Sequence, residues 1–195
     1  MDYIVKKSST GYQSLPLDAL LLTKRIVFLK GLITTDSVGL VIKQLLYLEA
    51  EDDVSPIKLV INTPGGSVSA GLALYWQVKA MNVPIDIIGI EMCLSMGAIL
   101  LAGAGKGHRF VMRGCKCMIH EPLISSETGG ISGSATSIQQ AAETILKTKD
   151  MLCELLAADT GHTVEEIKKS TSFDNFMNDE EALAFGLIDG IVDRI

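Results

Sequence analysis

Aromatic residues are scarce in this sequence, at 5% of its 195 residues, although hydrophobic residues make up 48%. Leu, Ile, Val, Ala and Met therefore carry most of the apolar content. A soluble monomer rarely exposes so much aliphatic surface, and a partner usually covers the excess. We therefore expect an oligomer.

Basic residues are too few and too scattered to form a nucleic-acid-binding surface. The 17 Lys and Arg are outnumbered by 23 Asp and Glu, which gives a formal charge of −6, whereas phosphate contacts need clustered positive charge. The longest uncharged apolar run, Met92 to Ala104, is too short to span a bilayer as a helix. The first residues lack the pattern of a secretory signal, and we expect a cytoplasmic protein.

A metal motif is also missing from the cysteine and histidine pattern. Cys115-Lys-Cys117 has no second pair at ligand spacing, and the three histidines do not supply one in sequence. The chain is larger than the secreted scaffolds that disulfides hold together. We therefore predict that all four cysteines are free, buried or half-buried thiols.

Apolar segments alternate with helical patterns along the chain, which predicts a mostly parallel α/β sheet joined by crossover helices. The predicted strands are 25–29, 57–61, 85–90, 109–112 and 117–119, and the predicted helices cover 38–46, 68–81, 95 onward and 135–158. A Gly/Ser-rich span, 125–134, precedes the long helix.

Local signals also predict where several helices begin and end. Thr35 or Asp36 could cap the helix around 38–46. Two capping boxes are expected, Thr163 with Glu166 and Asn178 with Glu181, and Gly186 is placed to end the last helix.

Three polar side chains could carry chemistry, although each also has an ordinary structural explanation. Ser95 stands where a buried strand gives way to a helix, whose free N–H groups favour negative charge, but serine is also a common helix cap. His120 follows a strand and could activate a serine or simply pack there. Asp174 could be a turn or cap residue.

Two glycine-rich loops could be binding sites. Gly65 and Gly66, in the loop 62–67, end another buried strand and let the backbone approach a ligand closely. Ligands gather at the carboxyl ends of parallel strands, so this loop and Ser95 could share one site, although a tight turn would need the same glycines. The stretch 103–107 lacks the spacing and the Ser/Thr of a phosphate-binding loop, which disfavours nucleotide binding.

Six windows, taken together and in this order, resemble the Clp peptidase subunit family from about Lys24 to Val192. They are Arg25-Ile-Val-Phe-Leu, the stretch 44–51, Ile61-Asn-Thr-Pro-Gly-Gly-Ser67, Leu94-Ser-Met-Gly-Ala98, Met118-Ile-His-Glu-Pro-Leu123, and the stretch 181–189. The resemblance implies a crotonase-like α/β spiral of ββα units in one domain, 1–195. Its head would comprise about 20–122 and 160–193, and a protruding long-helix handle about 123–159.

The resemblance further implies a serine endopeptidase subunit of an ATP-dependent system, which cuts unfolded proteins into short peptides inside two stacked rings of seven subunits. Ser95 would be the nucleophile, His120 the general base and acid, and Asp174 the carboxylate that orients the imidazole. The backbone N–H groups of Gly66 and Met96 would form the oxyanion hole. The handle would interlock the rings, a separate AAA+ unfoldase would use the ATP, and no metal or organic cofactor is expected.

One departure from the family pattern concerns the partner ATPase. The family docks a hydrophobic ATPase loop on aromatic clefts, and the matching positions here are Lys58, Val60 and Ala80. A charged lysine and no aromatic ring disfavour direct docking of an unfoldase. This departure motivates a prediction of mixed rings with a second, ATPase-docking paralogue.

Three further departures concern the active site and the axial gate. The loop after His120 is longer than usual, and its glycines Gly129, Gly130 and Gly133 lie further along. Phe173 stands where an arginine often pairs across the ring junction, and the segment 11–22 departs from the common amino-terminal pattern.

Two other functions stay open. The chain could be a weakly active or inactive ring subunit that serves as scaffold or regulator of an active paralogue, as Phe173 and the long loop suggest. A crotonase-type enzyme that stabilises a thioester enolate would share the fold, although a serine, a histidine and an aspartate at peptidase positions disfavour it.

Overall fold

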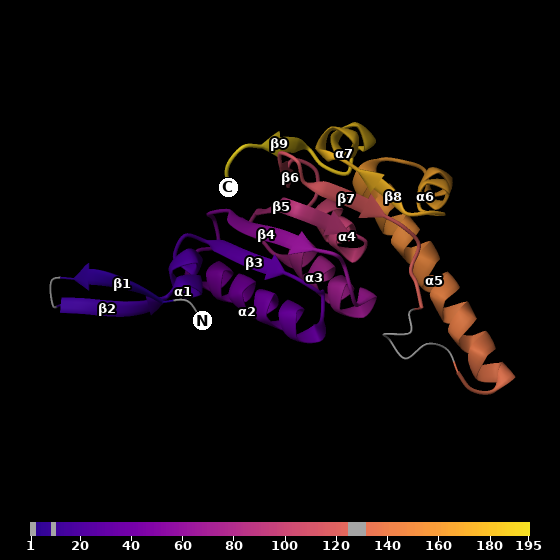
Figure 1. The fold of residues 1–195 in the computed structure, drawn as a ribbon, viewed down its shortest axis with the longest axis horizontal. Helices are drawn as coiled ribbons and strands as arrows, with labels where there is room; N and C mark the ends of the chain where they lie inside the picture. The colour runs from indigo at the N-terminus through magenta and orange to yellow at the C-terminus, as the bar shows by residue number, and fades with distance from the viewer. Residues whose placement is uncertain (1–2, 9–10, 125–131) are drawn as a thin grey trace.

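A computed structural model describes residues 3–8, 11–124 and 132–195, and shows an α/β body from which a hairpin and a long helix project on opposite sides (Figure 1). The strands are β1 (Tyr3–Ser8), β2 (Gly11–Pro16), β3 (Ile26–Lys30), β4 (Ile57–Thr63), β5 (Ile85–Leu94), β6 (Arg109–Met112), β7 (Lys116–Ile119), β8 (Asn175–Met177) and β9 (Gly190–Val192). The helices are α1 (Leu17–Leu22), α2 (Thr35–Glu51), α3 (Val68–Ala80), α4 (Met96–Gly103), α5 (Ala135–Thr160), α6 (Val164–Ser170) and α7 (Asp179–Phe185).

Seven strands form the central sheet, in the order β3-β4-β5-β6-β9, with β7 pairing with both β5 and β8. The β7–β8 pair is antiparallel and the other pairs of this sheet are parallel. Most residues of β4 and β5 are buried or half-buried, as expected for central strands of a parallel sheet. The predicted α/β fold with a parallel sheet is confirmed.

Strand β5 changes its pairing partner midway, and this change positions the site. Its first part, Ile87–Gly89, pairs with β6, whereas Met92–Leu94 pairs with β7. Between the two parts lies Glu91, with φ of 60°, and the Asn62 side-chain amide donates a 2.6 Å hydrogen bond to its carboxylate. The bend directs the carboxyl end of β5 toward β7.

Helices on one face of the sheet bury its apolar residues (Figure 1). Helix α2 turns one stripe inward, formed by Val38, Val41, Leu45 and Leu48. All eight residues of α4 are buried, because this helix lies between the sheet and helices α3 and α5. The helix that begins directly after Ser95 is therefore embedded in the core.

The helix-boundary predictions had mixed outcomes. Both capping boxes, at Thr163 and at Asn178, are present, and Gly186 ends α7 with φ of 80°. The predicted cap of α2 at Thr35 or Asp36 was wrong.

Thr34 caps α2 instead. Its hydroxyl accepts a 3.1 Å hydrogen bond from the Ser37 N–H, and the Ser37 hydroxyl accepts a 2.9 Å bond from the Thr34 N–H. A serine replaces the usual Glu or Gln of a capping box at this position, which hid the pattern in the sequence.

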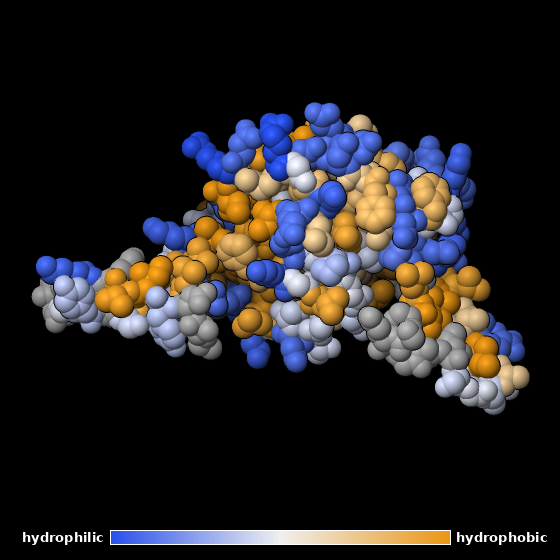
Figure 2. Space-filling view, in the orientation of Figure 1, coloured by the Kyte–Doolittle hydropathy of each residue, from blue (hydrophilic) through white to orange (hydrophobic). Residues whose placement is uncertain are grey.

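Helix α5 projects from the body because only its last third packs on it. The buried residues of α5 are Leu152, Cys153, Leu156 and Ala157. Toward its free end, Ile138 is 44% and Leu146 58% exposed, and apolar atoms are visible along both the hairpin and this helix (Figure 2). Among the described helices, none is long and apolar enough to cross a bilayer.

Candidate active site

Ser95 occupies a sharp turn between β5 and α4. Its φ of 55° and ψ of −120° place a non-glycine residue in a sparsely populated region. The Ser95 N–H donates a 2.8 Å hydrogen bond to the Met118 carbonyl, which ties the turn to β7. Ser95 is the N-cap residue of α4, but its hydroxyl makes no capping bond, so side-chain capping does not explain the serine at this position.

His120 meets that hydroxyl from the neighbouring strand. Its Nε2 lies 2.8 Å from the Ser95 Oγ, and its side chain is only 13% exposed. Parallel pairing of β5 with β7, with Leu94 opposite Met118, brings the two strand ends together. An imidazole at this distance can accept the hydroxyl proton.

Asp174 lies on the other side of the imidazole but is less well aligned. Its Oδ1 is 3.2 Å from the His120 Nδ1, which is close enough for an ion pair. The geometry is too poor for a hydrogen bond, and the buried Nδ1 has no other hydrogen-bond partner among the described residues. The Asp174 side chain is 65% exposed. Such contacts often tighten only when substrate binds.

The glycine loop after β4 lies directly against Ser95. A Cβ on Gly65 would lie 2.8 Å from the Ser95 Cβ, and a Cβ on Gly66 would lie 2.4 Å from the Ile33 carbonyl oxygen. Gly65 and Gly66 have φ of 101° and 146°, which favour glycine. The loop and Ser95 therefore share one site, and the turn needs these glycines as well.

The family comparisons agree with this arrangement of side chains. The model of the family described as Clp protease matches residues 9–195. The chain is also 40% identical, over 189 residues, to a protein of Ligilactobacillus salivarius (strain UCC118) named ATP-dependent Clp protease proteolytic subunit, covering 97% of this chain and 93% of that protein. This chain belongs to the Clp protease family.

As a Clp protease, the chain is an endopeptidase subunit, and the fold and activity implied by the sequence resemblance are confirmed. The comparisons give no support to the inactive-scaffold alternative or to the crotonase-type enzyme.

Residues that the sequence did not reveal hold the loop of this Clp protease in place. The buried Thr63 hydroxyl accepts a 3.0 Å hydrogen bond from the Gly65 N–H. The Ile33 N–H donates to the Gly65 carbonyl, and the Ser67 N–H donates to the Ile33 carbonyl, both at 2.8 Å. The threonine at the strand end, directly before Pro-Gly-Gly, was a sequence signal for the Thr63–Gly65 hydrogen bond. No sequence signal pointed to the contacts of Ile33.

A second set of contacts links the imidazole to α5. Lys149 of α5 forms an ion pair with Glu121, the residue after His120. The Glu121 N–H donates a 2.8 Å hydrogen bond to the Thr171 carbonyl, three residues before Asp174. The long helix is thus connected to both the histidine and the aspartate, through partners that lie far apart in the sequence.

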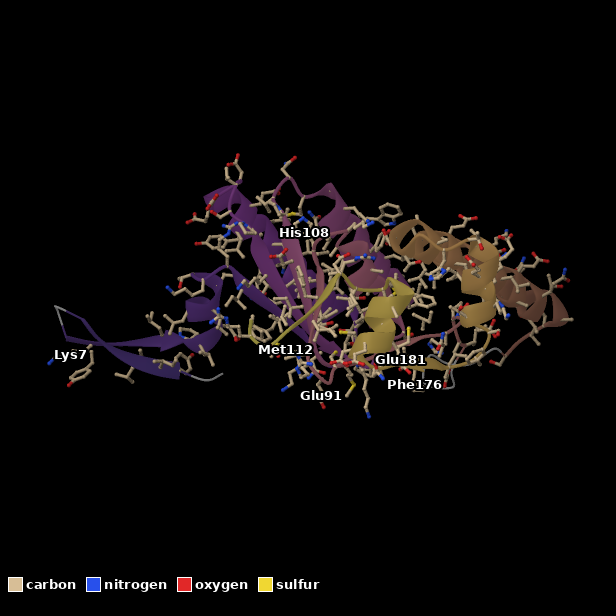
Figure 3. All side chains as sticks on the ribbon, turned by 90° about the horizontal axis from the view of Figure 1, so that it is seen from above. Lys7, Glu91, His108, Met112, Phe176 and Glu181 are labelled. Atoms are coloured by element: carbon tan, nitrogen blue, oxygen red, sulfur yellow. The ribbon has the colours of Figure 1, made fainter. Side chains whose placement is uncertain are left out.

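The other two histidines lie away from the site. His108 pairs with Asp86 at 2.7 Å, and it lies on the edge opposite to Glu91 and Phe176 (Figure 3). His162 contacts the Phe185 carbonyl at 2.9 Å. Within residues 3–8, 11–124 and 132–195, no three His, Cys, Asp or Glu side chains are placed to share a metal ion.

The positions weighed for partner docking do not form one apolar surface. Val60 is fully buried within the chain, Lys58 is half-buried beside Asp86 on the neighbouring strand, and Ala80 is exposed at the end of α3. Of the loop after His120, Gly129 and Gly130 lie outside the described residues, and Gly133 has φ of 141°.

Proposed function

We propose that this Clp protease subunit cleaves peptide bonds with Ser95 as nucleophile, His120 as general base and acid, and Asp174 as the carboxylate that orients the imidazole. The 2.8 Å separation of His120 Nε2 and Ser95 Oγ carries this assignment. The missing capping bond of Ser95 supports it, because the hydroxyl is available for reaction.

The reaction follows the order of proton transfers that this geometry allows. His120 takes the hydroxyl proton while the Ser95 oxygen attacks the scissile carbonyl, and the imidazolium then protonates the leaving amine. Water, deprotonated by the same imidazole, hydrolyses the acyl-enzyme. The backbone N–H groups of Gly66 and Met96 are proposed to bind the oxyanion, supported by the contact of the glycine loop with Ser95 and by the position of Met96 at the start of α4.

The proposed assembly is a barrel of two stacked rings of seven subunits, which takes unfolded polypeptides from a separate AAA+ unfoldase that uses the ATP. The exposed apolar residues Ile138 and Leu146 support a role for α5 in joining the rings. Buried Val60 and charged Lys58 favour rings mixed with a second paralogue that docks the ATPase. We further propose that the chain acts in the cytoplasm, as one domain, without a resident metal or organic cofactor.

A fluorophosphonate probe, applied to the assembled protein, tests the catalytic assignment. We expect labelling of the wild type and none of Ser95→Ala, together with a loss of peptide hydrolysis of at least about 10³-fold. His120→Ala should also abolish labelling, because the hydroxyl then lacks its base. Absence of labelling in every assembly, alone or with a paralogue, would instead support the scaffold.

A further inference from the structure

Three of the four cysteines lie together on or next to strands β5 and β7, which lead to Ser95 and His120. Cys93 of β5 and Cys117 of β7 are opposite each other in the parallel pairing, and Cys115 precedes Cys117 by two residues. Each is at most 1% exposed, and none forms a disulfide. The prediction of free, buried thiols is confirmed, but it did not reveal that they cluster.

A glycine makes room for the sulfur atoms of this cluster. A Cβ on Gly89 would lie 2.5 Å from the Cys93 Sγ and 3.4 Å from the Cys115 Sγ. The absence of a side chain at Gly89 therefore leaves room for the sulfurs of Cys93 and Cys115 to lie near each other.

The three thiols of the cluster differ in how readily they ionise. Interaction with the neighbouring Cys117 and Cys93 thiols lowers the pKa of Cys115, although burial and the carboxylates of Asp179 and Glu91 act in the opposite direction. Interaction with Cys115, followed by burial, raises the pKa of Cys93 and of Cys117. Within the cluster, Cys115 is therefore the thiol that ionises most readily and the one best suited to attack an oxidant, with Cys93 and Cys117 nearby to resolve the product.

We propose that Cys115, Cys93 and Cys117 form a peroxide-sensitive thiol site, whose oxidation to a disulfide within the cluster lowers the peptidase activity. The Cys115 thiolate attacks one oxygen of hydrogen peroxide and the O–O bond breaks. Hydroxide departs as the leaving group, and Cys115 becomes a sulfenic acid. A neighbouring thiol of the cluster attacks that sulfur, forms the S–S bond and releases water. Counting the proton that Cys115 gives up on ionisation, two thiols and one hydrogen peroxide yield one disulfide and two waters.

A disulfide in the cluster would change the active site through strands β5 and β7. Cys93 stands two residues before Ser95, and Cys117 three residues before His120. An S–S bond of about 2.05 Å requires the two sulfurs to move closer than any non-bonded contact allows. The same strand pair carries the hydrogen bond from Ser95 N–H to Met118, so this shift disturbs the turn that presents the nucleophile.

Cys115 is buried, so hydrogen peroxide reaches it only when the turn around it opens. Cys115 lies in the turn between β6 and β7, and its two chain neighbours, Gly114 and Lys116, are exposed. Local opening of such a turn costs less free energy than global unfolding. Cys153 provides a matched control, because it is also buried, at 3% exposure, but lies outside the cluster beside Thr171. Burial raises the pKa of Cys153.

The experiment titrates the assembled protein with hydrogen peroxide and maps thiols by differential alkylation and mass spectrometry. We expect Cys115 to lose free thiol at a peroxide concentration at least tenfold below that needed for Cys153, with a disulfide inside the cluster. Peptidase activity should fall at least fivefold in parallel and return with a dithiol reductant. Cys115→Ser and Cys115→Ala should keep their activity in peroxide, whereas Cys153→Ser should respond as the wild type does.

Two results would overturn the proposal: oxidation of Cys153 in step with Cys115, or equal inactivation of the wild type and both Cys115 variants. The effect on activity rests on the proposed function, but formation of the disulfide does not. Mass spectrometry therefore separates a failure of this inference from a failure of the peptidase assignment.

Discussion

Ser95 and Asp174 lie on opposite sides of the His120 imidazole, yet the protein holds these two residues in different ways. Ser95 lies between a buried strand and a fully buried helix, and its N–H is bonded to Met118. Asp174 precedes β8, a strand of three residues, and its side chain is 65% exposed. Its neighbours Phe173 and Phe176 are 61% and 59% exposed.

The hydrophobic core fixes the position of Ser95. The position of Asp174 can instead be set by contacts with other subunits. The nucleophile cannot move without disturbing packed strands, because interiors are close-packed. The carboxylate can move by a small shift of an exposed loop, and its contact with the imidazole is already poorly aligned. We therefore expect substitutions near Ser95 to be more severe than substitutions near Asp174.

Among substitutions that leave Ser95 and His120 in place, the largest effect is expected at Gly65, the residue that lies against the nucleophile. In Gly65→Ala, the new Cβ would lie 2.8 Å from the Ser95 Cβ and 3.2 Å from its Oγ, at a φ of 101° that alanine rarely adopts. We expect kcat/KM for a fluorogenic peptide to fall by about 100-fold, because small displacements of reacting groups have effects of that size.

Gly39→Ala is the matched control, because Gly39 lies within α2 and a Cβ there meets no atom within 4 Å. We expect unchanged activity and a gain in the free energy of unfolding of about 0.5–1 kcal/mol. If Gly65→Ala kept kcat/KM within threefold of the wild type, the site would not depend on close packing, and the comparison would fail.

Asp174→Asn should have an intermediate effect. The amide removes the charge that stabilises the imidazolium, but an exposed carboxylate acts through water, where charge interactions are weak. We expect kcat to fall by about 10- to 100-fold, short of the roughly 10⁴-fold loss known for a buried triad aspartate.

Assembly sharpens this prediction. If ring contacts bury and align Asp174, the effect of Asp174→Asn should grow from dilute, dissociated protein to the assembled particle, which paired measurements of kcat and particle size would reveal. A loss near 10⁴-fold already in dissociated protein would contradict the weak, exposed role that we assign to this carboxylate.

Local patterns in the sequence predicted most of the sheet and several helix ends. The strand 109–112 was predicted with its observed bounds, because an apolar run between turns needs no distant information. The hairpin β1–β2, helix α1 and the short strands β8 and β9 were missed. Strands of three residues carry too little pattern, and β8 exists only because β7 offers it an edge.

The site was predictable only where several windows were combined. Ser95, His120 and Asp174 each had an ordinary structural explanation. The six windows that match the family in the same order made the resemblance more convincing than those explanations. The ion pair of Glu121 with Lys149 could not be found, because the partners are 28 residues apart. The thiol cluster likewise depends on the bend at Glu91, which directs β5 from β6 to β7.

The smallest effect is expected from the ion pair that links α5 to the residue after His120. Lys149→Met removes the partner of Glu121, and the side chains of this pair are 28% and 41% exposed. Partly exposed pairs contribute about 0.2–1 kcal/mol. If this energy holds the imidazole in place, kcat should fall by about two- to fivefold while KM stays constant.

Lys168→Met is the matched control, because Lys168 forms a similar 2.7 Å pair with Asp150 of the same long helix, away from the imidazole. Its kcat should equal that of the wild type. The double variant Glu121→Lys with Lys149→Glu restores the attraction with the charges exchanged, so it should recover most of the lost kcat. An exchanged pair no better than Lys149→Met would mean that the lysine acts by packing alone, and that α5 does not align the histidine through charge.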